Sequence, residues 1–98
     1  MDELIINGKT TEGVNKLKGV KITIYTQGEV YDFYYSNNGI FNLKLPLGKN
    51  YEIVFYKRNY VAKKVEVMLK GVDDLVARAS QKHDLWVIDL FPKVHGVD

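Results

Sequence analysis

Apolar and polar residues alternate with a period of two along several short runs of this 98-residue chain. The clearest run is VKITIYT at residues 20–26, in which Val20, Ile22 and Ile24 alternate with polar or aromatic residues. Successive side chains of a strand point to opposite faces of its sheet, so this alternation is typical of a half-buried strand. The pattern therefore predicts β structure, and it recurs along most of the chain.

Seven runs are predicted to form strands on this basis, at residues 4–8, 20–25, 30–35, 41–45, 51–56, 60–67 and 85–90. The first is expected to end at Gly8, and the polar residues 9–18 to cross from one sheet to another. The Ser-Asn-Asn-Gly turn at 36–39 predicts a tight hairpin, because Asn and Gly accept positive φ. Pro46 and Gly48 end the next strand, since proline cannot donate to a ladder.

Residues 69–84 lack this alternation and are predicted to form a loop or short helix. Seven short strands in one small domain favour an antiparallel β-sandwich with Greek-key connections. The domain is expected to span residues 1–91, and residues 92–98 are expected to form a C-terminal tail. A chain of this length can bury about 60–65% of its unfolded surface, which is enough for one modest core.

Residues 39–55, GIFNLKLPLGKNYEIVF, carry the pattern G-x-F-x-l-x-L-P-x-G-x-x-Y-x-i-x-F. A strand with a glycine, IINGK at 5–9, and the segment LKGVKITI at 17–24 precede this pattern. A segment at 59–67 follows it, with Asn59 where glycine is usual. On these motifs the chain resembles the carboxypeptidase-regulatory-like domains, which share the transthyretin-like or prealbumin-like β-sandwich.

The resemblance covers residues 5–67 and a last strand, and it implies a transthyretin-like sandwich without catalytic activity. Similar domains occur as accessory modules of bacterial envelope and secreted proteins. The resemblance therefore implies a periplasmic, cell-envelope or secreted location. Residues 69–84 are longer than a simple hairpin connection, which departs from the family pattern and leaves the subfamily open.

The net charge is +2, and the densest basic cluster, Lys57, Arg58, Lys63 and Lys64, flanks one turn. Lysine is also common at solvated strand edges, so we predict no nucleic-acid binding. The absence of cysteine excludes disulfides and thiolate chemistry. No apolar run reaches the ~18 residues of a membrane helix, so direct membrane insertion is not expected. Because MDELIING is no signal peptide, either the protein is cytoplasmic or its leader lies outside this sequence.

Catalytic and metal-binding signatures are missing from the sequence. His83 and His95 are the only histidines, and no HxH or HExxH spacing places two ligands on one element. Ser36 and Ser80 have no GxSxG context, and the glycines form no phosphate-binding loop. We therefore predict that the protein is not an enzyme, with no catalytic residue, no metal and no cofactor.

The best functional lead is the surplus of aromatic residues, with seven Tyr and four Phe. In residues 30–35, Asp32 marks the face that is expected to contact solvent, and Tyr34 shares its parity. Tyr25 and Tyr56 also fall on the predicted outward parity of their strands. Exposed tyrosines can anchor a protein partner or stack on sugar rings. Alternatively, they form cross-strand pairs on a half-solvated sheet.

These observations lead to two functional hypotheses. The first is a non-catalytic accessory or structural domain of a bacterial envelope protein, which mediates protein–protein contact or acts as a spacer. Its partners would be other proteins or other domains of the same chain. The alternative is a carbohydrate-binding module that uses the outward tyrosines Tyr25, Tyr34 and Tyr56.

Overall fold

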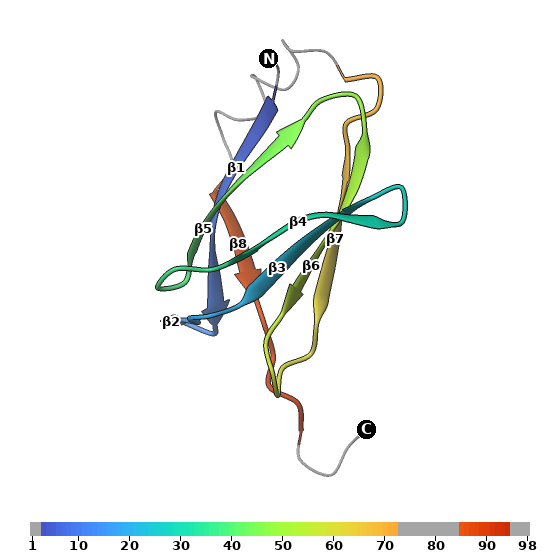
Figure 1. Cartoon of the computed structure of the whole chain (residues 1–98). Helices are drawn as coiled ribbons and strands as arrows, with labels where there is room; N and C mark the ends of the chain where they lie inside the picture. Colours follow the sequence, from blue (N-terminus) through green and yellow to red (C-terminus); the bar gives the residue numbers. More distant parts are fainter. Residues whose placement is uncertain (1–2, 73–84, 95–98) are drawn as a thin grey trace.

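The computed structural model describes residues 3–72 and 85–94, and within them it contains eight strands in two packed sheets (Figure 1). The strands are β1 (Glu3–Glu12), β2 (Asn15–Lys16), β3 (Lys21–Thr26), β4 (Glu29–Tyr35), β5 (Ile40–Pro46), β6 (Asn50–Tyr56), β7 (Lys63–Met68) and β8 (Leu85–Asp89). The predicted all-β sandwich is confirmed. The strand beyond the seven predicted is β2, a two-residue strand that pairs with the end of β1.

Each sheet has four strands among the described residues. We call them the β1 sheet, with β2, β1, β5 and β8, and the β3 sheet, with the order β4-β3-β6-β7. All strand pairs are antiparallel except β1 and β8, which run parallel. The connection that precedes β8 includes residues 73–84, so the predicted loop or short helix at 69–84 lies mostly outside the described residues. The Greek-key order stays a prediction.

The turn at residues 36–39 has the predicted chemistry, because Asn38 and Gly39 adopt positive φ values of 52° and 78°. The predicted hairpin is nevertheless wrong, since β4 pairs with β3 and β5 pairs with β1. Asn37 and Ile40 form only an isolated bridge at this point. The turn is a corner between the sheets, because the apolar face of β5 is buried against the β3 sheet.

The first strand is longer than the sequence suggested, and its expected end at Gly8 is wrong. Residues 9–12 continue β1 because their polar groups find partners within the fold. The Thr10 hydroxyl is fully buried and donates to the Leu17 carbonyl oxygen at 2.7 Å. It is also hydrogen-bonded to the Ser36 hydroxyl at 3.2 Å, and Ser36 Oγ accepts the Val20 N–H at 3.0 Å. A buried polar network therefore replaces the expected polar loop.

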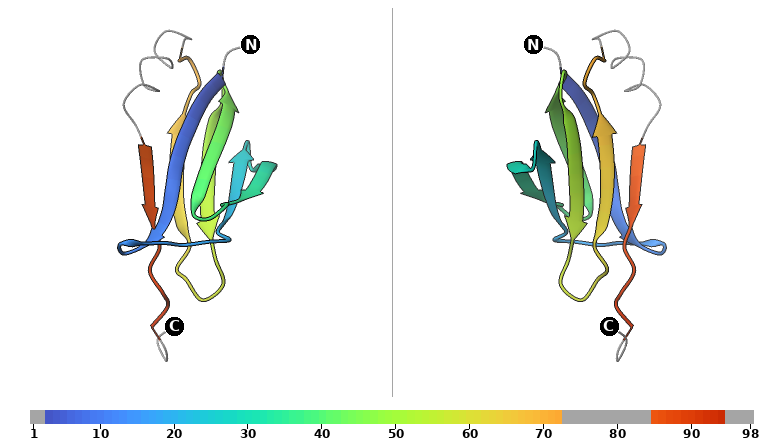
Figure 2. Two further views of the ribbon diagram at one scale, coloured as in Figure 1. Left: turned by 90° about the vertical axis from the view of Figure 1, so that its left-hand side faces the viewer. Right: turned by 90° about the vertical axis from the view of Figure 1, so that its right-hand side faces the viewer.

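The core lies between the two sheets (Figure 2) and is formed by the inward parity of their strands. The predicted inward residues of β3, β5 and β6 are all buried: Ile22, Ile24, Phe41, Leu43, Leu45, Tyr51, Ile53 and Phe55. Across the two sheets, the rings of Phe41 and Phe55 lie with their centroids 5.5 Å apart. Burial of these alternate side chains is what holds the sheets face to face.

Beyond β8 the chain stays hydrogen-bonded to the turn between β6 and β7. Pro92 forms an isolated bridge with Tyr60, and the Lys93 N–H donates to the Asn59 carbonyl oxygen at 2.9 Å. The Val61 N–H donates to the Phe91 carbonyl oxygen at the same distance of 2.9 Å. The start of the predicted C-terminal tail is thus paired with this turn.

The described part of the chain has neither a membrane-spanning helix nor a metal-ligand cluster. Within residues 3–72 and 85–94, no helix is long and apolar enough to cross a membrane. In the same residues, no three histidine, aspartate or glutamate side chains gather as a metal site would require. Ser80, His83 and His95 lie outside the described residues.

Candidate binding surfaces

The three tyrosines predicted to bind a partner do not share one surface. Tyr25 and Tyr56 lie on the outer face of the β3 sheet, in register with Glu52 and Lys21. Tyr34 lies opposite the fully buried Ile22, so its side chain is on the inner side of the same sheet. The predicted outward parity of Tyr34 is therefore wrong.

The position of β4 at the edge of the β3 sheet explains this result. Phe41 of β5 packs on Phe55 of β6, so the edge strand β5 of the β1 sheet lies over β6 and does not reach β4. The inner side of β4 is consequently accessible, and Tyr34 is 37% exposed. A polar residue such as Asp32 can occupy this inner side without full burial, which is why parity misassigned the strand.

Phe33 and Tyr35 lie on the outer side of β4, opposite to Tyr34. They contribute to a surface that we call the aromatic face, formed by Lys21, Phe33, Tyr35 and Tyr56. Lys21 lies in register between Tyr35 and Tyr56. Its Nζ is 5.0 Å from the centroid of the Phe33 ring. The rings of Phe33 and Tyr35 meet edge to face, with centroids 6.3 Å apart. Tyr56 is 47% exposed, Phe33 is 52% exposed and Tyr35 is 60% exposed.

Contacts within the aromatic face order its side chains. An aromatic pair or an exposed cation–π contact contributes about 0.5–1.5 kcal/mol, enough to favour one arrangement of the rings. The sequence interpretation missed Phe33 and Tyr35 because it took the face of Asp32 and Tyr34 as the solvent-exposed one, which put Phe33 and Tyr35 on the opposite face. The available signal was the run of three aromatic residues at 33–35. Successive side chains of a strand point to opposite faces, so a strand with one buried face must expose some of the three.

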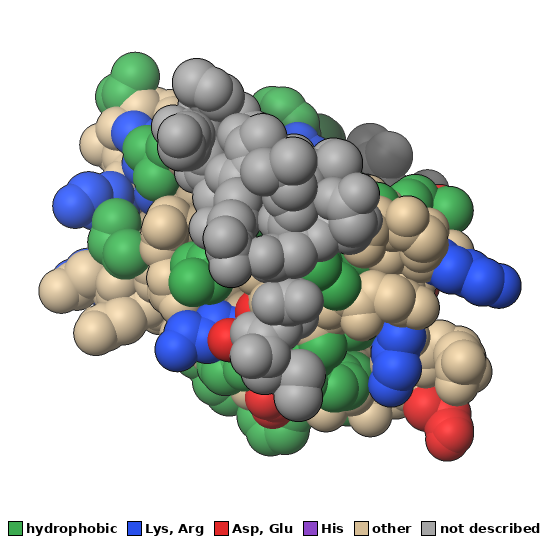
Figure 3. All heavy atoms as spheres, turned by 90° about the horizontal axis from the view of Figure 1, so that it is seen from above, with side chains coloured by type: hydrophobic (Ala, Val, Ile, Leu, Met, Phe, Trp, Pro, Cys, Tyr) green, Lys and Arg blue, Asp and Glu red, His purple; other side chains and the backbone are tan. Residues whose placement is uncertain are grey.

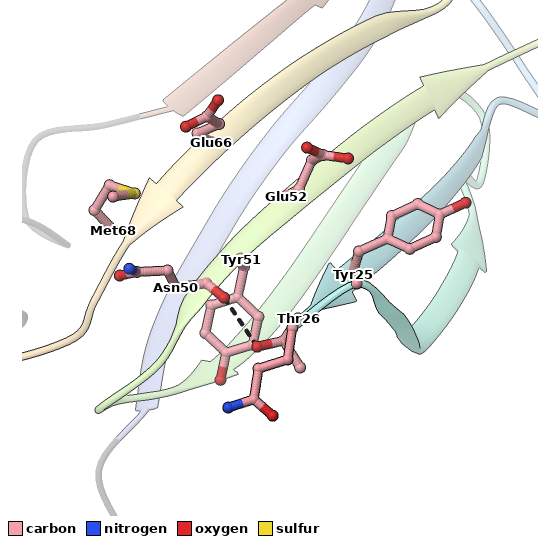
Figure 4. A pocket seen from close by; sticks show the side chains of 9 residues that line it. Tyr25, Thr26, Asn50, Tyr51, Glu52, Glu66 and Met68 are labelled. Atoms are coloured by element: carbon pink, nitrogen blue, oxygen red, sulfur yellow. Dashed lines mark hydrogen bonds between the residues drawn. The ribbon is translucent and has the colours of Figure 1, made fainter.

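The outer face of the β3 sheet also contains a hollow of about 480 Å³ beside Tyr25 (Figure 4). Glu52 and Glu66 face each other across β6 and β7 at its rim. Lys64 Nζ lies 3.5 Å from Glu52, an exposed ion pair of small energetic value. Asn50 also lines the hollow, and its carbonyl oxygen accepts the Thr26 hydroxyl at 2.9 Å. The hollow therefore combines the Tyr25 phenol with carboxylate and amide groups, and Tyr51, which is buried, also lines it.

A third surface lies where the sandwich is open between β4 and β5. A depression of about 560 Å³ occupies this position, and we call it the seam. Among the residues that line it are Lys16, Tyr34, Ile40, Phe41 and Asn42. Of the three predicted binding tyrosines, Tyr34 is the one that lines the seam. The structure thus distributes these tyrosines over three surfaces.

Tyr34 is held in the seam by Asp32. Its hydroxyl donates to Asp32 Oδ2 at 2.8 Å. This hydrogen bond to a carboxylate, with partial burial as the second cause, raises the pKa of Tyr34 from 10.0 to about 12. We predict that Asp32→Asn lowers the pKa of Tyr34 toward its ordinary value, as measured by tyrosinate absorbance against pH. Tyr35→Phe is the control, and it should leave the titration of Tyr34 unchanged.

The same bond predicts how stability depends on pH. Because the pKa of Tyr34 is higher in the folded than in the unfolded state, the contribution of its bond is complete below pH 10.0. That contribution is lost as the pH rises toward about 12. Urea denaturation of wild type and Asp32→Asn across this range should therefore converge at the alkaline end. Parallel curves would contradict the assignment.

On the end of the molecule that Figure 3 shows, the described Lys and Arg side chains do not form one patch. Lys and Arg side chains project there at separate points around the rim.

Comparison with known protein families finds no match for this chain, and comparison with curated proteins finds none either.

Proposed function

We propose that this chain is a non-catalytic accessory domain that binds another protein through the aromatic face. The resemblance of residues 5–67 to carboxypeptidase-regulatory-like domains supports a module of a bacterial envelope or secreted protein. A partner protein, or another domain of the same polypeptide, would cover the aromatic face in the assembly. In this role the sandwich is a rigid support that presents preordered side chains.

The observation that carries this proposal is the exposure of three neighbouring aromatic rings around Lys21. Phe33, Tyr35 and Tyr56 are each about half exposed, although they lie on a regular sheet. Aromatic side chains that become fully desolvated are the usual energetic centres of protein interfaces. A domain that acts only as a spacer has no need of this cluster, because charged residues would solubilise the face equally well.

Photo-crosslinking tests the proposal. A photoreactive phenylalanine derivative replaces Tyr35 or Tyr56 in the full gene product, which is expressed in the organism that encodes it. The matched control is the same derivative at Val87, which is 52% exposed on the outer face of the other sheet. We expect one discrete protein adduct from Tyr35 and Tyr56, absent from Val87 and lost when Phe33→Ala is added. Equal or absent crosslinking on both faces would favour the spacer.

The hollow beside Tyr25 favours a second candidate function, which is carbohydrate binding. An aromatic ring beside amide and carboxylate groups is the combination that stacks on a sugar and bonds its hydroxyls. A glycan array probed with wild type and with Tyr25→Ala, Tyr34→Ala and Tyr56→Ala separates the two candidates. Saturable binding that only Tyr25→Ala abolishes would support the carbohydrate-binding module.

A further inference from the structure

The two sheets of the sandwich do not match in extent on the side of β4 and β5. The β3 sheet continues to β4, whereas β5 is the last strand of the β1 sheet on that side. Figure 2 shows the β3–β4 hairpin projecting beyond the strands of the other sheet. The inner side of β4, where Tyr34 is 37% exposed, has no opposing strand among the described residues.

The edge of β5 that faces away from β1 carries backbone groups that pair with no strand of the described residues, and Ile40 shows which groups these are. Ile40 directs its N–H and carbonyl oxygen away from β1, because both bond to Asn37 at 2.9 Å. Alternate residues of a strand point their backbone groups to the same side. Asn42 and Lys44 therefore also direct theirs away from β1, and no strand of the described residues pairs with that side of β5.

One backbone donor on the neighbouring edge of β4 is occupied by a side chain of the same strand. The Phe33 N–H donates to Asp32 Oδ1 at 2.8 Å, which occupies the donor that an added strand would use. The register of β3 and β4 also shifts between Ile24 and Tyr25, and such irregularities disrupt further pairing. Of these two edges, β5 is therefore the one that better suits an added strand, because β4 has an occupied donor and a register shift.

We propose that the seam binds an extended segment of another polypeptide, which pairs with β5 and completes the β1 sheet opposite β4. Such a strand would lie about 4.8 Å beyond β5 and about 10 Å from the inner side of β4. Its inward side chains would then pack on Tyr34, which lines the seam. The seam has a volume of about 560 Å³ at this position, which accommodates such side chains.

Charge and proline placement specify the occupant further. Lys16 lines the seam, and Lys44 lies on the outer face of the β1 sheet in register with Ile5. Acidic residues on the outward parity of the added strand would be cross-strand neighbours of Lys44. Pro46 has no N–H to donate, so pairing is confined to the segment before it. The ligand is thus a short strand of alternating apolar and acidic residues.

This site and the aromatic face share Tyr35, which also lines the seam. Tyr56 lines the aromatic face and not the seam, so failure of crosslinking at Tyr56 would leave the present proposal intact. Main-chain pairing at a sheet edge is a recurrent mode of peptide recognition.

Selection of peptides against the whole chain tests the proposal. A phage-displayed library of random peptides supplies the probes, and the enriched peptides are synthesised for titration against three variants. Asn42→Pro removes the N–H at the free edge, whereas Asn42→Ala removes the side chain and keeps that N–H. Glu66→Pro is the matched control on β7, an edge strand of the β3 sheet. The Leu69 N–H donates to the Lys49 carbonyl oxygen on the side of β6, so the Glu66 N–H points away from β6.

We expect Asn42→Pro to weaken peptide binding about tenfold or more, which corresponds to the loss of one or two backbone hydrogen bonds. Glu66→Pro should bind as the wild type does, and Asn42→Ala should weaken binding much less than Asn42→Pro, because it keeps the N–H. Circular dichroism establishes that each variant is folded. Hydrogen exchange on the unaltered chain gives an independent measurement, in which the peptide should slow exchange at Asn42 and Lys44 and leave Phe41 unchanged.

Several results would overturn the proposal. One is equal binding of the selected peptides to wild type and Asn42→Pro without protection of Asn42 and Lys44. Failure to enrich any peptide over the Asn42→Pro background is another. Self-association of the chain that Asn42→Pro abolishes would identify a second copy as the occupant. An oligosaccharide that binds the seam and leaves the exchange at Lys44 unchanged would identify it as a glycan site.

Discussion

Replacing Phe55 with alanine should lower the free energy of unfolding by about 3–5 kcal/mol. Phe55 is fully buried on β6, and its ring contacts Phe41 from the other sheet at a centroid distance of 5.5 Å. Alanine removes both the transfer free energy of the ring and its contacts, and it leaves a cavity at the centre of the sandwich. Domains of this size are stable by about 5–15 kcal/mol, so the loss is a large fraction of the total.

The matched control for Phe55→Ala is Phe33→Ala, which removes the same side chain from the aromatic face. Phe33 is 52% exposed and has the ring contact with Tyr35 and the cation–π contact with Lys21. Its loss should lower the free energy of unfolding by no more than about 1.5 kcal/mol. Urea denaturation measures both values. Equal losses for the two variants would contradict the assignment of inner and outer faces.

Gly8→Ala should lower the free energy of unfolding by about 1–3 kcal/mol, which is unusual for the addition of one methyl group. A Cβ at Gly8 would lie 2.7 Å from Phe41 Cε2 and 2.8 Å from the Trp86 carbonyl oxygen. The Phe41 ring has little room to move in the core, and the carbonyl belongs to β8, which pairs in register with β1. The added methyl group therefore has to separate β8 from β1 or displace the ring.

Urea denaturation and the fluorescence of Trp86, the only tryptophan, follow the effect of Gly8→Ala. The double variant Gly8→Ala with Phe41→Leu tests the cause, because it relieves the contact with the ring and keeps the contact with the carbonyl oxygen. We expect the double variant to be less destabilised than the sum of the two single variants. Unchanged stability and fluorescence in Gly8→Ala would show that β1, β5 and β8 are further apart than described here.

The inward faces of the central strands were predictable from sequence. In β3, β5 and β6 the alternation of apolar and polar residues is regular, and each of these strands packs against the opposite sheet. For such strands, the odd or even position of a residue in the alternation is enough to tell which face of the sheet its side chain lies on. The positive φ of Asn38 and Gly39 was equally predictable, because it depends only on local conformational preference.

The length of β1 and the faces of β4 were not predictable in the same way. Thr10 appears polar in sequence, yet it is buried because the Leu17 carbonyl and the Ser36 hydroxyl are brought to it by the fold. Asp32 marks the wet side of β4, yet that side is the inner one because β5 lies over β6. In both cases a neighbour distant in sequence determines whether a polar group meets water or protein.

The sequence by itself determined that this protein is an all-β sandwich, which faces of β3, β5 and β6 form its core, and that turns lie at 36–39 and 46–48. These properties follow from alternation and from the backbone preferences of Gly, Asn and Pro, which act over a few residues. Only the tertiary structure decided that the turn at 36–39 joins two sheets, that Phe33, Tyr35 and Tyr56 surround Lys21, and that β5 has a free edge beside an uncovered strand. Strand pairing and register bring distant residues together, and a local pattern carries no information about which strands will be neighbours.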